Sequence, residues 1–212
     1  MTSQGSIGSV PARVRRKPDE AKRLILEAAS RLLAAGGPAA VQVRAVAAEV
    51  GVSDAAVNHH FGTREQLLEA LLRFGGATLK AELDGVVGAW AEGPVDPATL
   101  VHTLAALYAD GYAELALALH RSGWRDTGLG MLDDVVDRLH AQAREQCAGT
   151  GRTPPSREEV QVTVAALHQA VAMDPLFGDE FRRSVGLGDV RARMLDWWVE
   201  TLREVLAGQR GM

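Results

Sequence analysis

Residues 41–60 constrain the fold of this chain more than any other segment, because they read as two short helices joined at one glycine. One face of the first helix, just before Gly51, is formed by Val43, Val46, Ala47 and Val50. Ser53 suits the N-cap of the second helix, whose inward-facing residues would be Val57 and Phe61. Small helical domains use two such helices and a tight turn to place the second helix in the major groove of DNA. The pattern therefore predicts a helix-turn-helix.

Helix signals flank this unit on both sides. Pro18 suits a first helical position, and Gly36-Gly37-Pro38 would end the helix that it begins. Residues 63–66 have the form of a capping box, with Thr63 as N-cap. We expect the helix that follows to reach about Trp90, and residues 75–76, both glycine, to loosen or kink it.

The remainder of the chain also reads as helical. The four helices expected there run from Asp96-Pro97 through Leu119, from about 131 to 147, over about 156–173, and over about 189–207. Asp174-Pro175 should end or disturb the third of these helices, and Asp189 could cap the last. No segment has a convincing strand pattern, so the sequence predicts an all-α fold of about nine helices.

Composition limits the class of protein. Hydrophobic residues make up 47% of the chain and charged residues 24%, as in soluble globular proteins. No uninterrupted apolar run approaches the ~18 residues of a membrane span, and the N-terminus has no apolar segment typical of a secretory signal. The single cysteine, Cys147, excludes an internal disulfide framework. We therefore expect a cytoplasmic protein without a membrane partner.

Charge is divided unevenly along the chain, whose net charge is −4. Residues 13–73 hold ten Lys/Arg and seven Asp/Glu, a net of +3, whereas residues 74–212 hold thirteen and twenty, a net of −7. The positive part coincides with the predicted helix-turn-helix, as binding to phosphate requires. The acidic part should be a separate body.

These features predict three regions. Residues 1–17 read as a disordered, basic N-terminal arm, either a solvated tail or an arm that reaches phosphate or the minor groove. Residues 18–75 would form the DNA-binding domain, and residues 76–212 a separate helical body.

The segment from about 18 to 72 resembles the TetR family of bacterial transcriptional regulators. The resemblance is carried by an apolar first helix ending in Gly-Gly, then VRAVA at 43–47, GVS at 51–53, HHF at 59–61 and TREQL at 63–67. It implies a dimeric, ligand-responsive regulator, most often a repressor, that binds a palindromic operator. The resemblance also implies that residues 76–212 are a helical ligand-binding and dimerisation domain, although this part of the chain matches the family only in size and in its expected helices.

The candidate DNA-binding residues are Gln42, Arg44, Ser53, Asp54, Ala55, Asn58, His59, Thr63 and Arg64. On the second helix of the motif, Asn58 and His59 are the best candidates for base or phosphate contacts, because Val57 must face the core. Asp54 could accept from a cytosine amine, although helix capping is the simpler role. Arg44 and Arg64 would grip phosphates on either side.

Two positions depart from the family pattern. The family often has threonine where this chain has Gln42, and a tyrosine that touches phosphate where it has Asn58. Asn58 could donate to phosphate or read adenine through its amide. His60 should pack within the small domain, as the resemblance implies.

The last two helices are the expected dimer interface, where two from each subunit would build a four-helix bundle. The candidate interface residues are Val164, Leu167, Trp197, Trp198 and Leu202. Trp197 and Trp198 are adjacent, so they point about 100° apart around a helix. One should fill the subunit core and the other the partner surface; the alternative places both in the core.

An effector cavity is expected in the helical body. The candidate ligand-binding residues are Leu104, Tyr108, Tyr112, His120, Trp124, Met131 and His168. An apolar wall with a few polar groups is typical of small-molecule sites, so we expect a mostly hydrophobic effector; ordinary core packing is the alternative for any single position. The resemblance implies that the ligand acts by moving the fourth helix, with residues 75–76 as the lever.

An enzyme is the main alternative class, and an adaptor without sequence-specific DNA binding is the other. The six histidines are His59, His60, His102, His120, His140 and His168, and none falls in HExxH or another recognised metal spacing. Ser122 lies in no GxSxG elbow. We therefore expect no catalytic residue, no metal and no cofactor.

Overall fold

The computed structural model describes residues 18–125 and 130–209, so the predicted arm of residues 1–17 lies outside the described residues. Within them the regular elements are nine α-helices and one π-helical turn, without a strand. Their bounds are α1 Pro18–Ala40, α2 Val43–Val50, α3 Asp54–Phe61, α4 Arg64–Glu92, α5 Pro97–Leu107, η1 Tyr108–Tyr112, α6 Ala113–Arg121, α7 Asp133–Cys147, α8 Arg157–Ser184 and α9 Arg191–Leu206. The predicted all-α class is confirmed.

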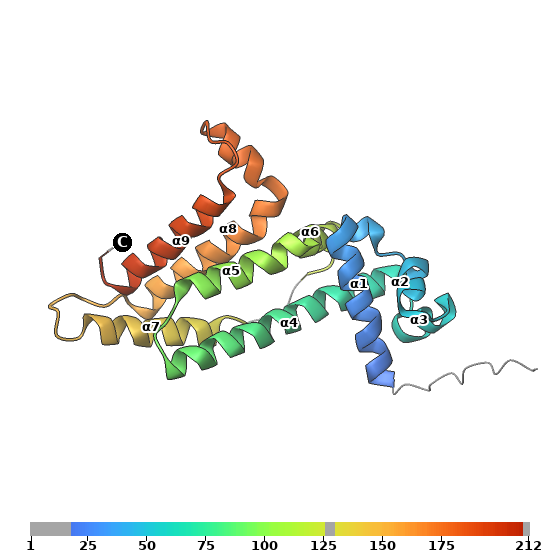
Figure 1. The fold of residues 1–212 in the computed structure, drawn as a ribbon, viewed down its shortest axis with the longest axis horizontal. Coiled ribbons are helices and arrows are strands. Elements are labelled where there is room, and N and C mark those ends of the chain that lie inside the picture. The colour runs from blue at the N-terminus through green and yellow to red at the C-terminus, as the bar shows by residue number, and fades with distance from the viewer. Residues whose placement is uncertain (1–17, 126–129, 210–212) are drawn as a thin grey trace, which may run out of the picture.

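The N-terminal helices form a unit at one end of the molecule (Figure 1). Helices α1, α2 and α3 enclose an apolar core with the first turns of α4, and its fully buried side chains include Ile25, Leu33, Val46, Val57, Leu67 and Leu71. The α1 segment is broken at Gly36 and Gly37, as predicted, and Gly37 has a φ of 64° that suits glycine. This break turns the chain into α2.

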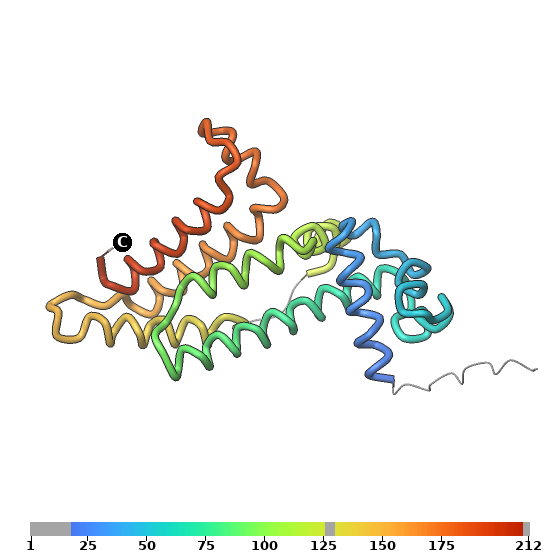
Figure 2. The backbone as a smooth tube through the Cα atoms, in the orientation of Figure 1, coloured from blue at the N-terminus to red at the C-terminus, as the bar shows by residue number. Residues whose placement is uncertain are grey.

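The second core fills the helical body. Its members come from α4, α5, α7, α8 and α9 and include Leu83, Trp90, Leu100, Leu104, Leu139, Leu167 and Leu202. Figure 2 traces α4 from the N-terminal unit into this body, where it packs against α5 and α7. The expected kink at residues 75–76 is absent, because α4 is one helix from Arg64 to Glu92. The predicted domain boundary at residue 75 therefore falls within a continuous helix.

One predicted helix is interrupted. Instead of running from Pro97 through Leu119, the chain forms α5, then η1, then α6. Within η1, Gly111 has a φ of 90°, and a Cβ there would lie 2.9 Å from the backbone oxygen of Leu33 in α1. The interruption thus lets the chain pack closely on α1, and π-helical turns are frequent at functional sites.

The last two helices also differ from their predicted bounds. Helix α8 continues through Pro175 to Ser184, although its ribbon changes direction along the way (Figure 1). Arg182 is buried and donates to Asp174 and Asp179, which ties the turns beyond the proline to those before it. Helix α9 begins after Val190 without a side-chain cap, so the prediction that Asp189 caps it is wrong.

Candidate nucleic-acid interface and effector cavity

The turn between α2 and α3 is built by local hydrogen bonds. Gly51 takes the left-handed conformation with a φ of 74°, and its N–H donates to the backbone oxygens at the end of α2. Ser53 then caps α3, because its Oγ accepts from the N–H of Ala56 at 3.2 Å. The two short helices are therefore held in the predicted helix-turn-helix order.

The outer face of α3 carries the residues that the sequence assigned to it. Val57 is buried in the N-terminal core, which leaves the opposite side of this two-turn helix to solvent. The exposed residues there are Asp54, Ala55, Asn58 and His59. His60 is half-buried, and its ring meets that of Phe61 edge-on with centroids 6.4 Å apart.

The helix starts on either side of α3 contribute further polar groups. Gln42 is exposed at the start of α2, and its Nε2 donates to the backbone oxygen of Ala39 at 2.9 Å. Arg44, the second residue of α2, is also exposed. Thr63 forms the predicted capping box with Gln66, which fixes the start of α4 beside α3.

Arg64 lies differently from its predicted role as a phosphate ligand. Arg64 is half-buried, and its guanidinium donates to two backbone oxygens, from Nε to Val41 just after α1 at 2.9 Å and from Nη2 to Pro38 in the last turn of α1 at 2.6 Å. Two of its three nitrogens thus hold the N-terminal unit together. Arg44 is the better-exposed cation beside α3.

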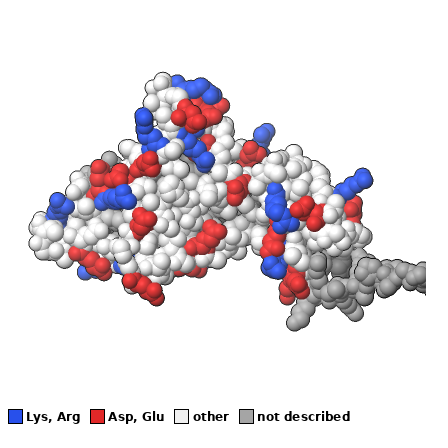
Figure 3. All heavy atoms as spheres, in the orientation of Figure 1, with Lys and Arg blue, Asp and Glu red and all other residues white. Residues whose placement is uncertain are grey.

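Charge on the face drawn in Figure 3 is mixed rather than basic. Lys/Arg and Asp/Glu side chains are interspersed over the body with broad uncharged areas between them. They gather on the projection formed by the end of α8 and the start of α9, where Asp174 binds both Arg182 and Arg191.

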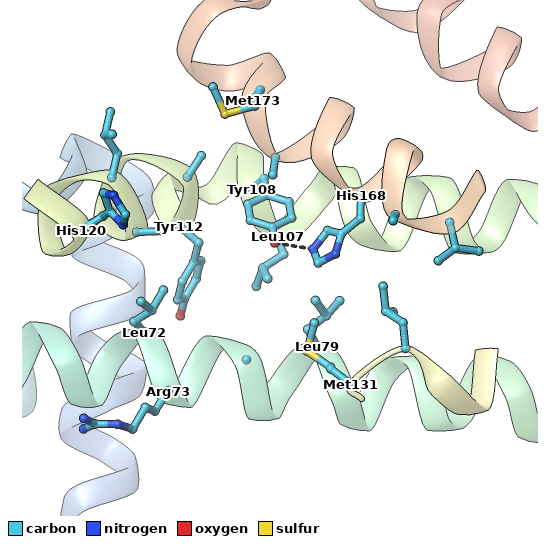
Figure 4. Close-up of a pocket in the computed structure, with 18 of the residues that line it drawn as sticks. Leu72, Arg73, Leu79, Leu107, Tyr108, Tyr112, His120, Met131, His168 and Met173 are labelled. Atoms are coloured by element: carbon cyan, nitrogen blue, oxygen red, sulfur yellow. Dashed lines mark hydrogen bonds between the residues drawn. The ribbon is translucent and has the colours of Figure 1, made fainter. Parts of the chain in front are cut away.

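A cavity of about 890 Å³ lies among the helices of the body. Its walls come from α4, from α5 through α6, from the residues that lead into α7, and from α8 (Figure 4). Six of the seven predicted ligand-binding residues line it: Tyr108, Tyr112, His120, Trp124, Met131 and His168. Leu104 does not, because its side chain is fully buried in the core of the body.

Two tyrosines of η1 make different hydrogen bonds at the cavity wall. The hydroxyl of Tyr108 lies 2.6 Å from Nε2 of His168 in α8. The hydroxyl of Tyr112 instead reaches Oγ of Ser30 in α1 at 2.9 Å. Burial raises the pKa of Tyr112 above its ordinary value and lowers the pKa of His168 below its own, which favours the uncharged form of both side chains.

Much of the cavity wall was missed by sequence reasoning. The additional lining residues include Leu72, Arg73, Gly76 and Leu79 of α4 and Gln161, Val164, Ala165, Ala172, Met173 and Leu176 of α8. Most are apolar residues in a helical pattern, which is equally typical of core packing. The one feature of the sequence that could have indicated a cavity beside α4 is the pair of adjacent glycines at 75–76, because residues without a side chain leave space beside a helix.

Comparison with known proteins places the chain in a family. The family model described as bacterial regulatory proteins, tetR family, matches residues 25–71. The HTH-type transcriptional repressor Rv3405c of Mycobacterium tuberculosis is 31% identical over 195 residues, covering 88% of this chain and 97% of the relative. The HTH-type transcriptional regulator Mb3439c of Mycobacterium bovis matches to the same extent.

The chain belongs to the TetR family. It is a transcriptional regulator with a helix-turn-helix formed by α2 and α3. The relatives are named as regulators rather than as enzymes. Among residues 18–125 and 130–209, no cluster of His, Cys, Asp or Glu could hold a metal ion, and no helix is long and apolar enough to cross a membrane.

Three predicted interface residues of this TetR-family chain lie inside the subunit. Val164, Leu167 and Leu202 are each at most 2% exposed, so they have no surface to offer a partner. Val164 also lines the cavity. The sequence could not separate the two faces of α8 and α9, because both faces carry apolar residues.

The tryptophan pair divides as the sequence predicted, with one ring inward and one outward. Trp198 packs against the core of the body, and Trp197 is 49% exposed. Their rings meet edge-on with centroids 5.0 Å apart. The outward ring belongs to a larger set of exposed apolar side chains on α8 and α9: Val162, Phe177, Phe181, Met194 and Trp197.

Proposed function

We propose that this regulator is a ligand-responsive repressor that binds a palindromic operator as a dimer and is released by a mostly apolar small molecule. The observation that supports this most strongly is the course of α4. Its first turn packs beside α3, and its residues Leu72, Gly76 and Leu79 line the cavity. A ligand that shifts α4 would therefore also shift the recognition helix.

Helix α3 would enter the major groove with its exposed face toward the bases. Asn58 can pair with adenine through both groups of its amide, and His59 lies next to it on the exposed side. The methyl group of Ala55 suits contact with a thymine methyl. Arg44, Gln42 and the backbone N–H groups at the helix starts would hold phosphates.

The dimer would form through the outer faces of α8 and α9. The exposed apolar side chains there, among them Phe177, Met194 and Trp197, would be covered by the same surface of a second copy. Two copies related by a two-fold axis would present their α3 helices to half-sites about 34–36 Å apart or a multiple of it. Repression is the mode named for one relative.

A DNA-binding experiment tests this function directly. The purified chain should retard a DNA fragment from upstream of its own gene more strongly than random DNA, with an affinity that falls steeply between about 50 and 200 mM salt. Asn58→Ala and His59→Ala should alter the preferred sequence. Apolar compounds should release the fragment. Equal binding to all sequences, or release by charged compounds alone, would contradict the proposal.

A further inference from the structure

The polar side chains around the cavity differ in their exposure and in the hydrogen-bond or ion-pair partners that they bind. Arg73 is paired with Glu69 at 3.1 Å, its side chain is 63% exposed, and it points away from Tyr108 and His168 in Figure 4. Asp133 is exposed and lies 3.8 Å from Arg157. Neither charge therefore faces the interior of the cavity alone.

The tyrosines and histidines that line the cavity also differ in their hydrogen-bond partners and in their exposure. Tyr112 directs its hydroxyl to Ser30 of α1, and His120 is exposed at the rim. Tyr108 and His168 are both half-buried and hydrogen-bonded to each other between η1 and α8. They are the polar pair that an apolar ligand body in the cavity would meet (Figure 4).

The direction of the hydrogen bond within this pair decides what it offers a ligand. Burial lowers the pKa of His168 and so favours the uncharged imidazole, whose Nε2 can accept the phenolic proton of Tyr108 in one of its two tautomers. A phenolic oxygen that donates its proton still accepts, and its acceptor strength rises because the two bonds polarise each other. In the tautomer in which Nε2 accepts, the pair favours a ligand group that donates.

An ionised ligand group is disfavoured at this position. The free energy needed to move a carboxylate or an ammonium ion from water into an apolar site is far larger than the stabilisation from one hydrogen bond, unless an opposite charge lies beside the ion. The charged groups of the wall, Arg73 and Asp133, already have partners near its edge.

We propose that Tyr108, held by His168, recognises the head group of the effector, which is an uncharged, largely apolar molecule whose hydroxyl group donates to the Tyr108 oxygen. This inference rests on the proposed ligand-binding function of the cavity, and it adds the chemical class of the ligand. His168 acts as a positioning residue, because it fixes the direction of the phenolic proton.

A matched set of competitors tests the head group. The full-length protein is titrated with N-phenyl-1-naphthylamine, followed by its fluorescence, and the dye is displaced by naphthalene, 2-naphthol or 2-naphthoate. We expect 2-naphthol to compete at a concentration about five- to tenfold lower than naphthalene, and 2-naphthoate to be weaker than 2-naphthol. Tyr108→Phe should bring 2-naphthol to within about twofold of naphthalene.

Two further variants separate this role from a merely structural one. Tyr112→Phe removes the other tyrosine hydroxyl of the cavity wall, which is bound to Ser30, and should keep the preference for 2-naphthol. His168→Leu removes the acceptor of the phenolic proton, so Tyr108 can donate to the ligand instead. This variant should shift preference from 2-naphthol toward 2-methoxynaphthalene, which only accepts.

The outcomes distinguish the two proposals. If neither the dye nor any competitor binds, the ligand-binding function fails and the inference fails with it. If the compounds bind but 2-naphthoate is the strongest, or if Tyr108→Phe keeps the full preference for 2-naphthol, only the inference about the head group is overturned.

Discussion

The ring of Tyr112 occupies the space that Gly75 leaves on α4. A Cβ at Gly75 would lie 2.6 Å from Cδ1 of Tyr112 and closer still to Cε1. The same tyrosine lines the cavity and bonds to Ser30 of α1. One side chain thus contacts the cavity, the helix that passes beneath it, and the first helix of the N-terminal unit.

Replacing Gly75 should therefore separate α4 from η1. In Gly75→Ala the new methyl group must displace the Tyr112 ring, and we expect the free energy of unfolding to fall by about 1–3 kcal/mol. Thermal and urea unfolding measure this. The matched control is Gly76→Ala, because a Cβ at Gly76 meets no heavy atom within 4 Å. That variant should be neutral or gain up to about 1 kcal/mol from helix propensity; equal losses in both variants would contradict the packing argument.

The two arginines beside α3 should respond differently to removal. Arg44→Ala should leave the melting temperature unchanged, weaken binding nearly uniformly across DNA sequences, and reduce the salt slope by about one. Arg64→Ala should instead destabilise the protein by about 1–3 kcal/mol, because the oxygens of Val41 and Pro38 lose their donor. Melting curves and salt titrations of both variants separate these effects. A stable Arg64→Ala protein with only weakened DNA binding would contradict the structural role and support the predicted phosphate contact.

The tryptophan pair gives a matched test of the proposed dimer interface. Trp197→Ala should weaken self-association at least about tenfold, since exposed aromatic residues at interface centres carry much of the binding energy. Trp198→Ala should lower the free energy of unfolding by about 2–5 kcal/mol, because that ring packs against the core. Sedimentation equilibrium and unfolding curves measure the two quantities. A Trp197→Ala protein that associates as tightly as the parent would exclude this face.

His168 should make the stability of the protein depend on pH. Burial lowers its pKa in the folded state from the ordinary 6.5, so the unfolded chain binds a proton more readily. The stability from this group is present above pH 6.5, falls as the pH drops through that value, and stops falling below the lowered pKa of the folded state. The ring is hydrogen-bonded to the hydroxyl of Tyr108, and the other titratable or polar side chains that line the same cavity include Gln161 and Asp133.

Urea unfolding at several values between pH 7.5 and pH 5 measures this dependence. His168→Gln keeps a side chain that can accept from Tyr108 but does not titrate, so its stability should fall less than that of the parent over this range. A variant with the same slope as the parent would show that His168 is not the group responsible.

Helix ends were predictable where the signal is local. Ser53 and Thr63 each accept from a backbone N–H three residues later, as their sequence patterns indicated. Such a cap needs only the residues of one turn, so its geometry follows from the sequence of that turn. The exposed face of α3 was also predictable from local sequence. Because Val57 must face the core, the residues on the opposite side of this two-turn helix must face solvent.

Longer-range contacts decided the features that were predicted wrongly. The break at η1 depends on Gly111 meeting Leu33, which lies far away in the sequence. The continuation of α8 beyond Pro175 accompanies the binding of Arg182 and Arg191 to Asp174. Neither contact leaves a mark in the local pattern of apolar residues.

The chain's own residue pattern was sufficient for the all-helical class, the helix-turn-helix and the aromatic and histidine side chains that line the cavity. Only the tertiary structure decided that Leu104 and Leu167 fill the core while Leu72 and Leu176 line the cavity. All four are leucines at helical spacing, and they differ only in how closely another helix approaches them. That distance is set by the packing of the whole molecule, so no single segment of the sequence encodes it.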